Sequence, residues 1–254
     1  MIDYFHLEKY GVTAVNYNRD LEVFPVLKDI LFKIVGKDIY YSPTDMGVNV
    51  IKDCITDENG VIEASKNEII RRYYKALVDQ KKGIVSYEVV ERIKCLMNEL
   101  NIVETDRKVV EKALEKKKKS NCHSACIEIG KKYITGRQTT LLSPISSVII
   151  NAIKYLTHIP DDVDILSPSI LEPILKMKDK TLNFKESTLS LNEVLLALSI
   201  CSATNPIVGE ALDKLSELNH TQLHATYIIP DSEAIILNNL GINATCEVEA
   251  NLSN

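Results

Sequence analysis

The strongest constraint on the fold is a change in hydrophobic periodicity close to residue 120. Before it, apolar residues recur at steps of three and four, which is typical of amphipathic helices; these stretches cover residues 21–34, 63–80, 86–100 and 105–119. After it, short strand-like runs alternate with helical runs, as in α/β domains. We therefore predict an α+β protein, with an N-terminal helical bundle at 1–118 followed by an α/β domain at 119–254.

The second half contains clear local signals for its elements. Gly130 separates two alternating runs, which predicts a β-hairpin over 125–135. Helices are expected to begin at Ser143-Pro144, Ser167-Pro168 and Asn205-Pro206, because a capping residue followed by proline is typical of a helix start. A strongly apolar helix is predicted at 191–202, strands at 163–166, 221–229 and 242–248, and a helix at 231–240 closed by Gly241. Together these runs predict a mixed sheet of four or five strands.

Charge and composition exclude several classes of protein. The net charge is −5, and residues 120–254 carry 9 Lys/Arg against 15 Asp/Glu, so this half is expected to repel nucleic acid. The run Lys116–Lys119 is interpreted as the solvated end of a helix, where cations are favourable. No apolar run approaches the roughly 18–20 residues of a membrane span, and Met1 is not followed by a signal peptide. We expect a cytoplasmic protein that contacts no membrane.

Cysteine usage indicates reduced thiols. The chain has six cysteines without a secretory signal, which is typical of a reducing compartment. Cys122 and Cys126 have half the spacing pattern of a zinc site, but no second Cys/His pair stands at suitable spacing. We therefore expect no metal site, and the sequence points to no particular cofactor.

The best local candidate for chemistry is the segment that runs from Thr135 to Pro144. A strand ends there, a glycine permits close backbone approach, and a guanidinium and two hydroxyls precede a helix start. The residues are Gly136, Arg137, Thr139 and Thr140. This arrangement predicts a cradle for a phosphate or carboxylate group. The alternative is a β-turn leading to a capped helix, with Arg137 in a surface salt bridge.

Two further polar clusters accompany helix starts or loops. Thr204 and Asn205 precede a predicted helix, next to a very apolar one. In the first half, Asn16 and Arg19 precede a predicted helix, whereas Thr44 and Asp45 lie in an irregular insertion at 36–60. Long polar loops in helical bundles often carry function. Capping and turn formation alone would also explain each cluster.

Several long blocks of the chain resemble an uncharacterised bacterial family, domain of unknown function 1846. The blocks are Phe5–Gly11, Thr13–Asp20, Ser42–Asn49, Glu68–Tyr74, Thr135–Arg137, Ala203–Pro206 and Leu240–Asn243, with Thr245–Glu247. The resemblance implies proteins about twice this length, which begin with an α/β domain whose Gly-rich, lysine-bearing loop suggests nucleotide or phosphate binding. It therefore implies that this chain is similar only to the family's C-terminal half, with a separate N-terminal-half domain as partner. Two departures are Arg137, where members tend to have lysine, and the Cys122/Cys126 pair.

These observations lead to one functional hypothesis and two alternatives. We expect a bacterial protein that binds a nucleotide or a phosphorylated small molecule in a cleft between its domains, as part of a transferase or hydrolase. Asp45 would be its catalytic acid/base, Arg137 the phosphate clamp, and Arg19, Thr139 and Asn205 would line the cleft. The first alternative is a non-catalytic interaction or oligomerisation module that buries the apolar helix 191–201; a homo-oligomer is expected. The second is a truncated remnant.

Overall fold

The computed structural model describes residues 14–16, 33–36, 40–44, 48–51, 58–181 and 188–248. The chain divides into two compact units, Met1–Arg107 and Lys108–Asn254. We predicted a boundary after residue 118, whereas this division falls ahead of helix α5 (Lys108–Ser120). The reason is that α5 packs on the sheet of the second unit, where Ser124 Oγ donates a hydrogen bond to Ala113 O at 2.7 Å.

The first unit contains a small sheet, which the predicted helical bundle with an irregular insertion at 36–60 did not include. Strands β1 (Ala14–Asn16), β2 (Tyr40–Thr44) and β3 (Val48–Ile51) pair antiparallel in the order β1-β3-β2. Part of the insertion predicted to be irregular, residues 36–60, is therefore strand. Its β-branched and aromatic residues favour extended structure. The helix predicted at 21–34 lies outside the described residues, except for a helical turn at 33–35.

The longest elements described in the first unit are two helices. Helix α3 (Glu58–Lys81) and helix α4 (Tyr87–Glu99) pack against each other, with Ile70 and Tyr74 buried on α3 and Val90 and Ile93 buried on α4. A short 3-10 helix, η2 (Glu104–Asp106), follows. Ser86 precedes α4 in extended conformation at the N-cap position, but its side chain makes no capping hydrogen bond.

The second unit contains the predicted mixed sheet, with four strands. Strands β4 (Ser124–Ile129), β5 (Lys132–Arg137), β6 (Gln222–Ala225) and β7 (Asn243–Cys246) follow the order β5-β4-β6-β7. The β6–β7 pair is parallel and the other two pairs are antiparallel. The strand predicted at 163–166 is wrong: the segment is irregular and follows a turn closed by a hydrogen bond from Val163 N to Pro160 O at 3.1 Å.

The α-helices that follow the β4–β5 hairpin begin where the sequence predicts. They are α6 (Pro144–Leu156), α7 (Pro168–Lys176), α8 (Leu191–Ser202), α9 (Pro206–Asp213) and α10 (Asp231–Asn239). The π-helix η3 (Met177–Thr181) and the 3-10 helix η4 (Lys214–Leu218) were not predicted. Ser143 and Asn205 each accept a hydrogen bond at a helix start. Across the described segments, no helix has both the length and the apolar character needed to cross a membrane.

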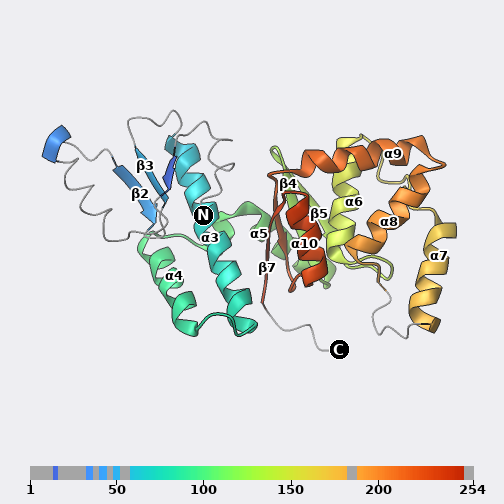
Figure 1. Ribbon diagram of the computed structural model, residues 1–254, viewed down its shortest axis with the longest axis horizontal. Coiled ribbons are helices and arrows are strands. Elements are labelled where there is room, and N and C mark those ends of the chain that lie inside the picture. The colour runs from blue at the N-terminus through green and yellow to red at the C-terminus, as the bar shows by residue number, and fades with distance from the viewer. Residues whose placement is uncertain are drawn as a thin grey trace. The chain divides into compact units, whose positions relative to one another are not determined.

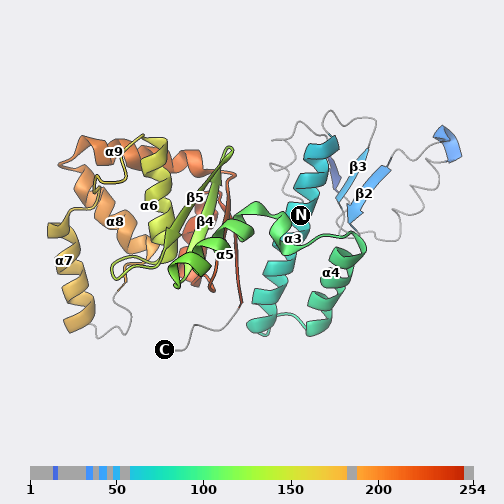
Figure 2. The same cartoon turned by 180° about the vertical axis from the view of Figure 1, so that it is seen from behind.

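Helices α5 and α6 cover opposite faces of the sheet (Figures 1 and 2). The backbone of α6 lies directly against Gly136: a side-chain carbon there would stand 2.7 Å from Val148 Cα and 2.8 Å from Ser147 C. On the other face, Val109 and Ala113 of α5 pack with Cys126 of β4. The sheet is therefore enclosed between a helix on each side.

Candidate anion-binding edge of the four-stranded sheet

The two faces of the sheet differ sharply in polarity. Residues paired in register point to the same face, so the pairs Ser124↔Arg137, Cys126↔His224 and His224↔Thr245 place these side chains together. The face towards α5 carries Ser124, Cys126, Glu128, Tyr133, Thr135, Arg137, Gln222, His224, Asn243 and Thr245. Apart from Lys132 at the hairpin turn, the face towards α6 carries Ala, Ile, Leu, Gly and Cys. Chemistry on this sheet therefore belongs to the α5 face.

One edge of the sheet collects the carboxyl ends of three strands. β5, β6 and β7 run in the same direction because β4 is antiparallel to both β5 and β6, while β7 is parallel to β6. We call this the carboxyl edge. Ligands of open α/β sheets bind outside such strand ends. Arg137, at the end of β5, is the cation that the sequence singled out, and it lies here with an exposed side chain.

The lysine-rich end of α5 reaches the same edge. The thiol of Cys122 lies 3.2 Å from Ser120 Oγ, at the end of α5, and 3.6 Å from the carbonyl of Gln138, which follows Arg137. The side of α5 that faces the sheet carries Val109 and Ala113, and helical spacing continues this stripe to Lys116. The sequence interpretation treated the lysine run as an isolated helix end, because only the fold brings the end of α5 to the segment that follows Arg137.

The cations at this edge have few carboxylate partners. Within the residues that the structure describes, Arg137, Lys116, Lys118 and Lys119 form no ion pair. By contrast, Lys108 and Lys112, nearer the start of α5, pair with Glu111 and Glu115 at 3.2 and 3.0 Å. The positive charges of Arg137, Lys116 and Lys118 are therefore available to an external anion.

A buried histidine lies on β6, one residue before the strand ends at the carboxyl edge. His224 is fully buried, with Nδ1 2.9 Å from Thr245 Oγ1 and Nε2 3.2 Å from Glu247 Oε1. The Glu247 carboxylate can only accept, so Nε2 carries a hydrogen and the carboxylate fixes the ring orientation. Glu247 follows the neighbouring parallel strand, so the sequence alone does not pair it with His224.

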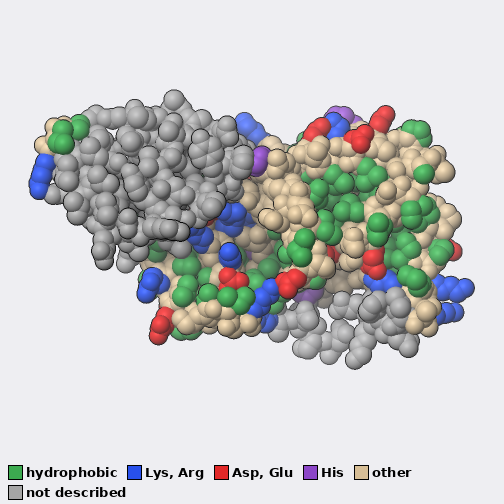
Figure 3. Space-filling model, in the orientation of Figure 1, with side chains coloured by type: hydrophobic (Ala, Val, Ile, Leu, Met, Phe, Trp, Pro, Cys, Tyr) green, Lys and Arg blue, Asp and Glu red, His purple; other side chains and the backbone are tan. Residues whose placement is uncertain are grey.

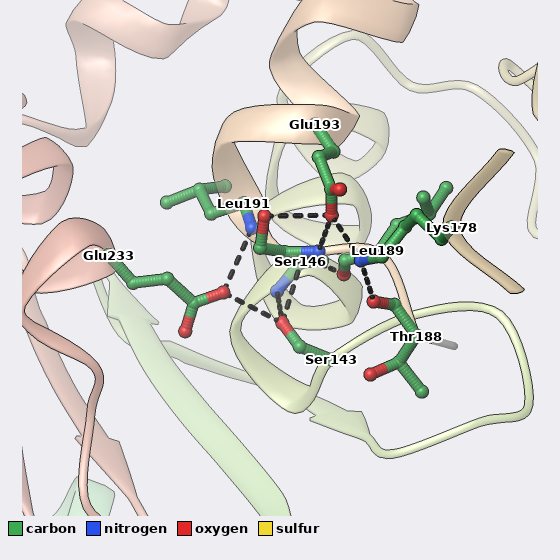
Figure 4. A network of polar contacts seen from close by, with 9 residues as sticks. Ser143, Ser146, Lys178, Thr188, Leu189, Leu191, Glu193 and Glu233 are labelled. Carbon is green, nitrogen blue, oxygen red and sulfur yellow. Dashed lines mark hydrogen bonds and ion pairs between the residues drawn. The ribbon is translucent and has the colours of Figure 1, made fainter. Parts of the chain in front are cut away.

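The anion cradle predicted at the start of α6 already holds a carboxylate of the protein itself (Figure 4). Ser143 Oγ accepts a hydrogen bond from Ser146 N at 3.1 Å and donates one to Glu233 Oε1 at 3.0 Å. Leu191 N, at the start of α8, donates to the same Glu233 oxygen at 2.9 Å. Glu233, on α10, is almost fully buried. Two helix starts therefore converge on one internal anion, which stabilises both.

A tyrosine completes this Glu233 network. Tyr227 OH donates to Glu233 Oε2 at 3.3 Å. Burial raises the pKa of Tyr227, and the charge of Glu233 and its hydrogen bond raise it further. The ring of Tyr227 also stacks on His123, with centroids 5.5 Å apart. The phenol is therefore a neutral donor that holds Glu233 in place.

A second cluster, seen beside the first in Figure 4, fixes the other side of the α8 start. Lys178 Nζ donates to Glu193 Oε2 and to the carbonyl of Thr188, both at 2.7 Å. Ser190 N and Oγ donate to the same carboxylate at 2.8 and 2.9 Å. Burial alone would raise the pKa of Glu193, but the hydrogen bonds from Lys178 and Ser190 outweigh it, and the pKa lies below its ordinary value. The cluster is structural, because its polar groups satisfy one another.

The structure gives several predicted site residues a local role. Gly136 makes room for the backbone of α6. Thr139 Oγ1 accepts hydrogen bonds from Leu141 N and Leu142 N at 3.2 and 2.9 Å, so it shapes the loop before α6. Thr140 is exposed in this loop. Arg137 points to the opposite face of the sheet from α6, so the guanidinium and the start of α6 do not form one cradle.

The remaining predicted residues lie elsewhere. Thr204 Oγ1 donates to Cys201 O at 3.3 Å, and Asn205 caps α9, at the end of α8 remote from Leu191. In the first unit, Asn16 and Thr44 both pair with Val48, from the two strands that flank β3. They therefore share one row of the small sheet. Arg19 and Asp45 lie outside the described residues, and a cleft shared with the second unit stays a prediction.

No metal-binding cluster of three or more His, Cys, Asp or Glu residues occurs within the described ranges. Cys126 is buried beneath α5, whereas Cys122 is partly exposed beside Gln138. Cys126 therefore belongs to the packed face of the sheet, and Cys122 belongs to the carboxyl edge.

Comparison with known proteins identifies the family. Residues 1–101 match the model described as domain of unknown function DUF1846, N-terminal, and residues 105–253 match DUF1846, C-terminal. The expected similarity to the C-terminal half alone is therefore corrected. The match to both domain models in order also does not favour the alternative of a truncated remnant.

Curated relatives carry the name UPF0371 protein. One from Clostridium botulinum (strain Alaska E43 / Type E3) is 48% identical over 257 residues, which cover 97% of this chain and 51% of the relative. Another, from Clostridium botulinum (strain Langeland / NCTC 10281 / Type F), is 46% identical, with 98% and 52% coverage. The chain thus spans about half the length of the curated relatives it matches. From both comparisons, the chain belongs to the DUF1846 family, whose domains have no known function.

Proposed function

We propose that the second unit binds a phosphorylated small molecule, such as a nucleotide or a sugar phosphate, at the carboxyl edge of its sheet. The observation that carries this proposal is the meeting of Arg137 with the lysine-rich end of α5. Cys122 contacts both segments, at 3.2 Å from Ser120 Oγ and 3.6 Å from Gln138 O. An exposed guanidinium beside several ammonium groups is the chemistry that recognises phosphate.

The charge pattern supports an external anion rather than an internal one. Lysines near a helix C-terminus are favourable to the helix dipole by themselves, so the lysine run alone would indicate nothing. Arg137 belongs to a different element, on the polar face of the sheet, and it has no partner within the described ranges. In the same unit, Lys178 and Glu193 satisfy each other. Arg137, Lys116 and Lys118 thus stand at this edge without an ion pair within the described ranges.

In this proposal, the carboxyl edge binds and orients the phosphorylated ligand. The chemical reaction on that ligand takes place in a larger protein. For a transferase or hydrolase, Asp45 remains the candidate acid/base, and Asn16, Arg19 and Thr44 remain candidate ligand-binding residues of the first unit. Thr204 and Asn205 form a further candidate polar cluster of the second unit. A separate N-terminal-half partner and a cytoplasmic location, where such ligands are abundant, are parts of the same proposal.

Isothermal titration with pyrophosphate, ATP and glucose 6-phosphate tests binding. We expect Arg137→Ala to weaken the binding of the best ligand by about tenfold or more, because a charge-assisted bidentate contact contributes about 1.5–3 kcal/mol. Arg137→Lys should recover part of the affinity, since it keeps the charge but not the fork. Lys116→Ala should also weaken binding.

Lys131→Ala is the matched control, because Lys131 is an exposed lysine at the hairpin turn, at the opposite end of β4 and β5. It should leave affinity unchanged. Failure of all three ligands to bind, or binding that is insensitive to Arg137→Ala, would overturn the proposal.

A non-catalytic interaction module is the second candidate function. It is favoured by exposed apolar side chains on α8 and α9, Leu196, Ile200 and Ile207.

A further inference from the structure

Helix α8 is apolar on both of its sides. Val194, Ala197, Leu198 and Cys201 are buried and pack in the second unit, as an amphipathic helix requires. The opposite side carries Leu196 and Ile200, which are 59% and 57% exposed. The buried side of α8 already packs in the core of the second unit. The fold of this unit therefore gives no reason for the exposed side, with Leu196 and Ile200, to be apolar.

The apolar side continues onto the next helix. Ile207, in the first turn of α9, is 52% exposed, and Ala203 and Pro206 between the helices are exposed as well. We call the surface formed by Leu196, Ile200, Ala203, Pro206 and Ile207 the α8–α9 face. In Figure 3, hydrophobic side chains gather over the part of the molecule that Figure 1 labels α8 and α9. Clusters of this kind mark interaction sites more often than single exposed residues do.

The α8–α9 face also lacks charge. From Val194 to Gly209 the sequence contains no Asp, Glu, Lys or Arg, although 26% of the whole chain is charged. Its other exposed residues, Ser199, Thr204 and Asn205, are neutral. A partner that docks through charges would find no complementary group on this surface.

We propose that the α8–α9 face is the interface with a second copy of this chain. Each copy has a net charge of −5, so two copies repel each other except where an uncharged surface lets them approach. Homodimer interfaces are more apolar than other interfaces, and two-fold symmetry is the commonest arrangement. A membrane surface fits less well, because membrane-binding helices usually carry Lys or Arg on their polar side and α8 carries only Glu193 as a charged residue.

Analytical ultracentrifugation over a range of protein concentrations tests this interface. The wild-type chain should dimerise reversibly. Leu196→Glu and Ile200→Glu should each raise the dimer dissociation constant about tenfold or more, because two-fold symmetry places each new carboxylate in the interface twice. The control Ile235→Glu changes an equally exposed residue, 60% exposed on α10, and should leave dimerisation unchanged.

Circular dichroism and thermal unfolding show whether each variant is folded, and the milder Ile207→Ser provides a second probe of the same face. A wild-type chain that is monomeric at every concentration would overturn the proposal. So would a dimer that withstands both glutamate substitutions. Binding of the monomer to phosphatidylglycerol vesicles that is lost in Leu196→Glu would assign the face to a membrane instead. Ligand binding at Arg137 is independent of all these outcomes.

Discussion

Glu233 and Ser143 stand ninety positions apart in the chain, yet their side chains meet at 3.0 Å beneath the starts of α6 and α8. This contact decides what the start of α6 can do. Its positive end is already compensated by a buried carboxylate, so an external anion has to bind elsewhere. Arg137 lies at the carboxyl edge on the other face of the sheet, and its side chain forms no ion pair within the described ranges.

Removing Glu233 should destabilise the second unit. Glu233→Ala leaves Ser143 Oγ, Leu191 N and Tyr227 OH without their acceptor, and each buried unsatisfied group costs about 1–3 kcal/mol. We expect a loss of about 2–5 kcal/mol in the free energy of unfolding, and a smaller loss for Glu233→Gln, which keeps an acceptor oxygen. Urea unfolding measures both. The exposed Glu210→Gln on α9 is the control, and equal stability of Glu233→Ala and wild type would contradict the network's role.

The two glycines Gly136 and Gly209 should respond to alanine in opposite ways. Gly136→Ala forces a methyl group into the backbone of α6 at Val148 and should cost about 1–3 kcal/mol or more. Gly209 lies within α9 with no atom within 4 Å of the new carbon, so Gly209→Ala should stabilise by about 0.5–1 kcal/mol. Thermal unfolding distinguishes them. A stable Gly136→Ala protein would mean that α6 does not lie against β5 as described.

Acid should weaken the start of α8 through Glu193. The pKa of Glu193 lies below its ordinary value of 4.5 in the folded protein. A lowered pKa gives stability that is fully present above the unfolded value and is lost as the pH falls through the folded one. The stability difference between wild type and Glu193→Gln should therefore be largest near pH 6–7 and shrink below about pH 4.5. Urea unfolding across this range measures it, with the exposed Glu172→Gln as control. A stability difference between wild type and Glu193→Gln that grows as the pH falls would contradict the lowered pKa of Glu193.

Alkaline pH should destabilise the folded protein through Tyr227. Its pKa is raised, so the folded state keeps the phenol proton, and the stability this provides is complete below about pH 10 and falls above it. Carbon-13 NMR of labelled tyrosine rings should show Tyr227 still protonated where exposed tyrosines ionise. Tyr227→Phe assigns the signal. A Tyr227 signal that titrates together with the exposed rings would refute its bond to Glu233.

The sequence predicted the elements that have local causes. Ser143-Pro144 and Asn205-Pro206 mark helix starts because capping and the fixed proline torsion act within one turn. The small sheet of the first unit was missed, since its strands are three to five residues long and β2 contains Pro43. Periodicity needs longer windows than these.

The chemistry was harder to predict because its causes are non-local. Arg137 was identified, but the lysines beside it were dismissed, since only the packing of α5 on the sheet joins the two segments. His224 and Glu247 follow the same pattern across β6 and β7. Glu233 carries no motif at all, and only the fold shows that it fills the place predicted for a ligand.

The most direct test of the anion-binding edge is a nitrogen-15 NMR titration of the full chain with pyrophosphate. The account predicts saturable shifts concentrated at the amides of Arg137, Gln138 and Lys117–Ser120, and their loss in Arg137→Ala but not in Lys131→Ala. No shifts, or shifts that centre on the start of α6 near Ser143 and Ser146, would contradict it.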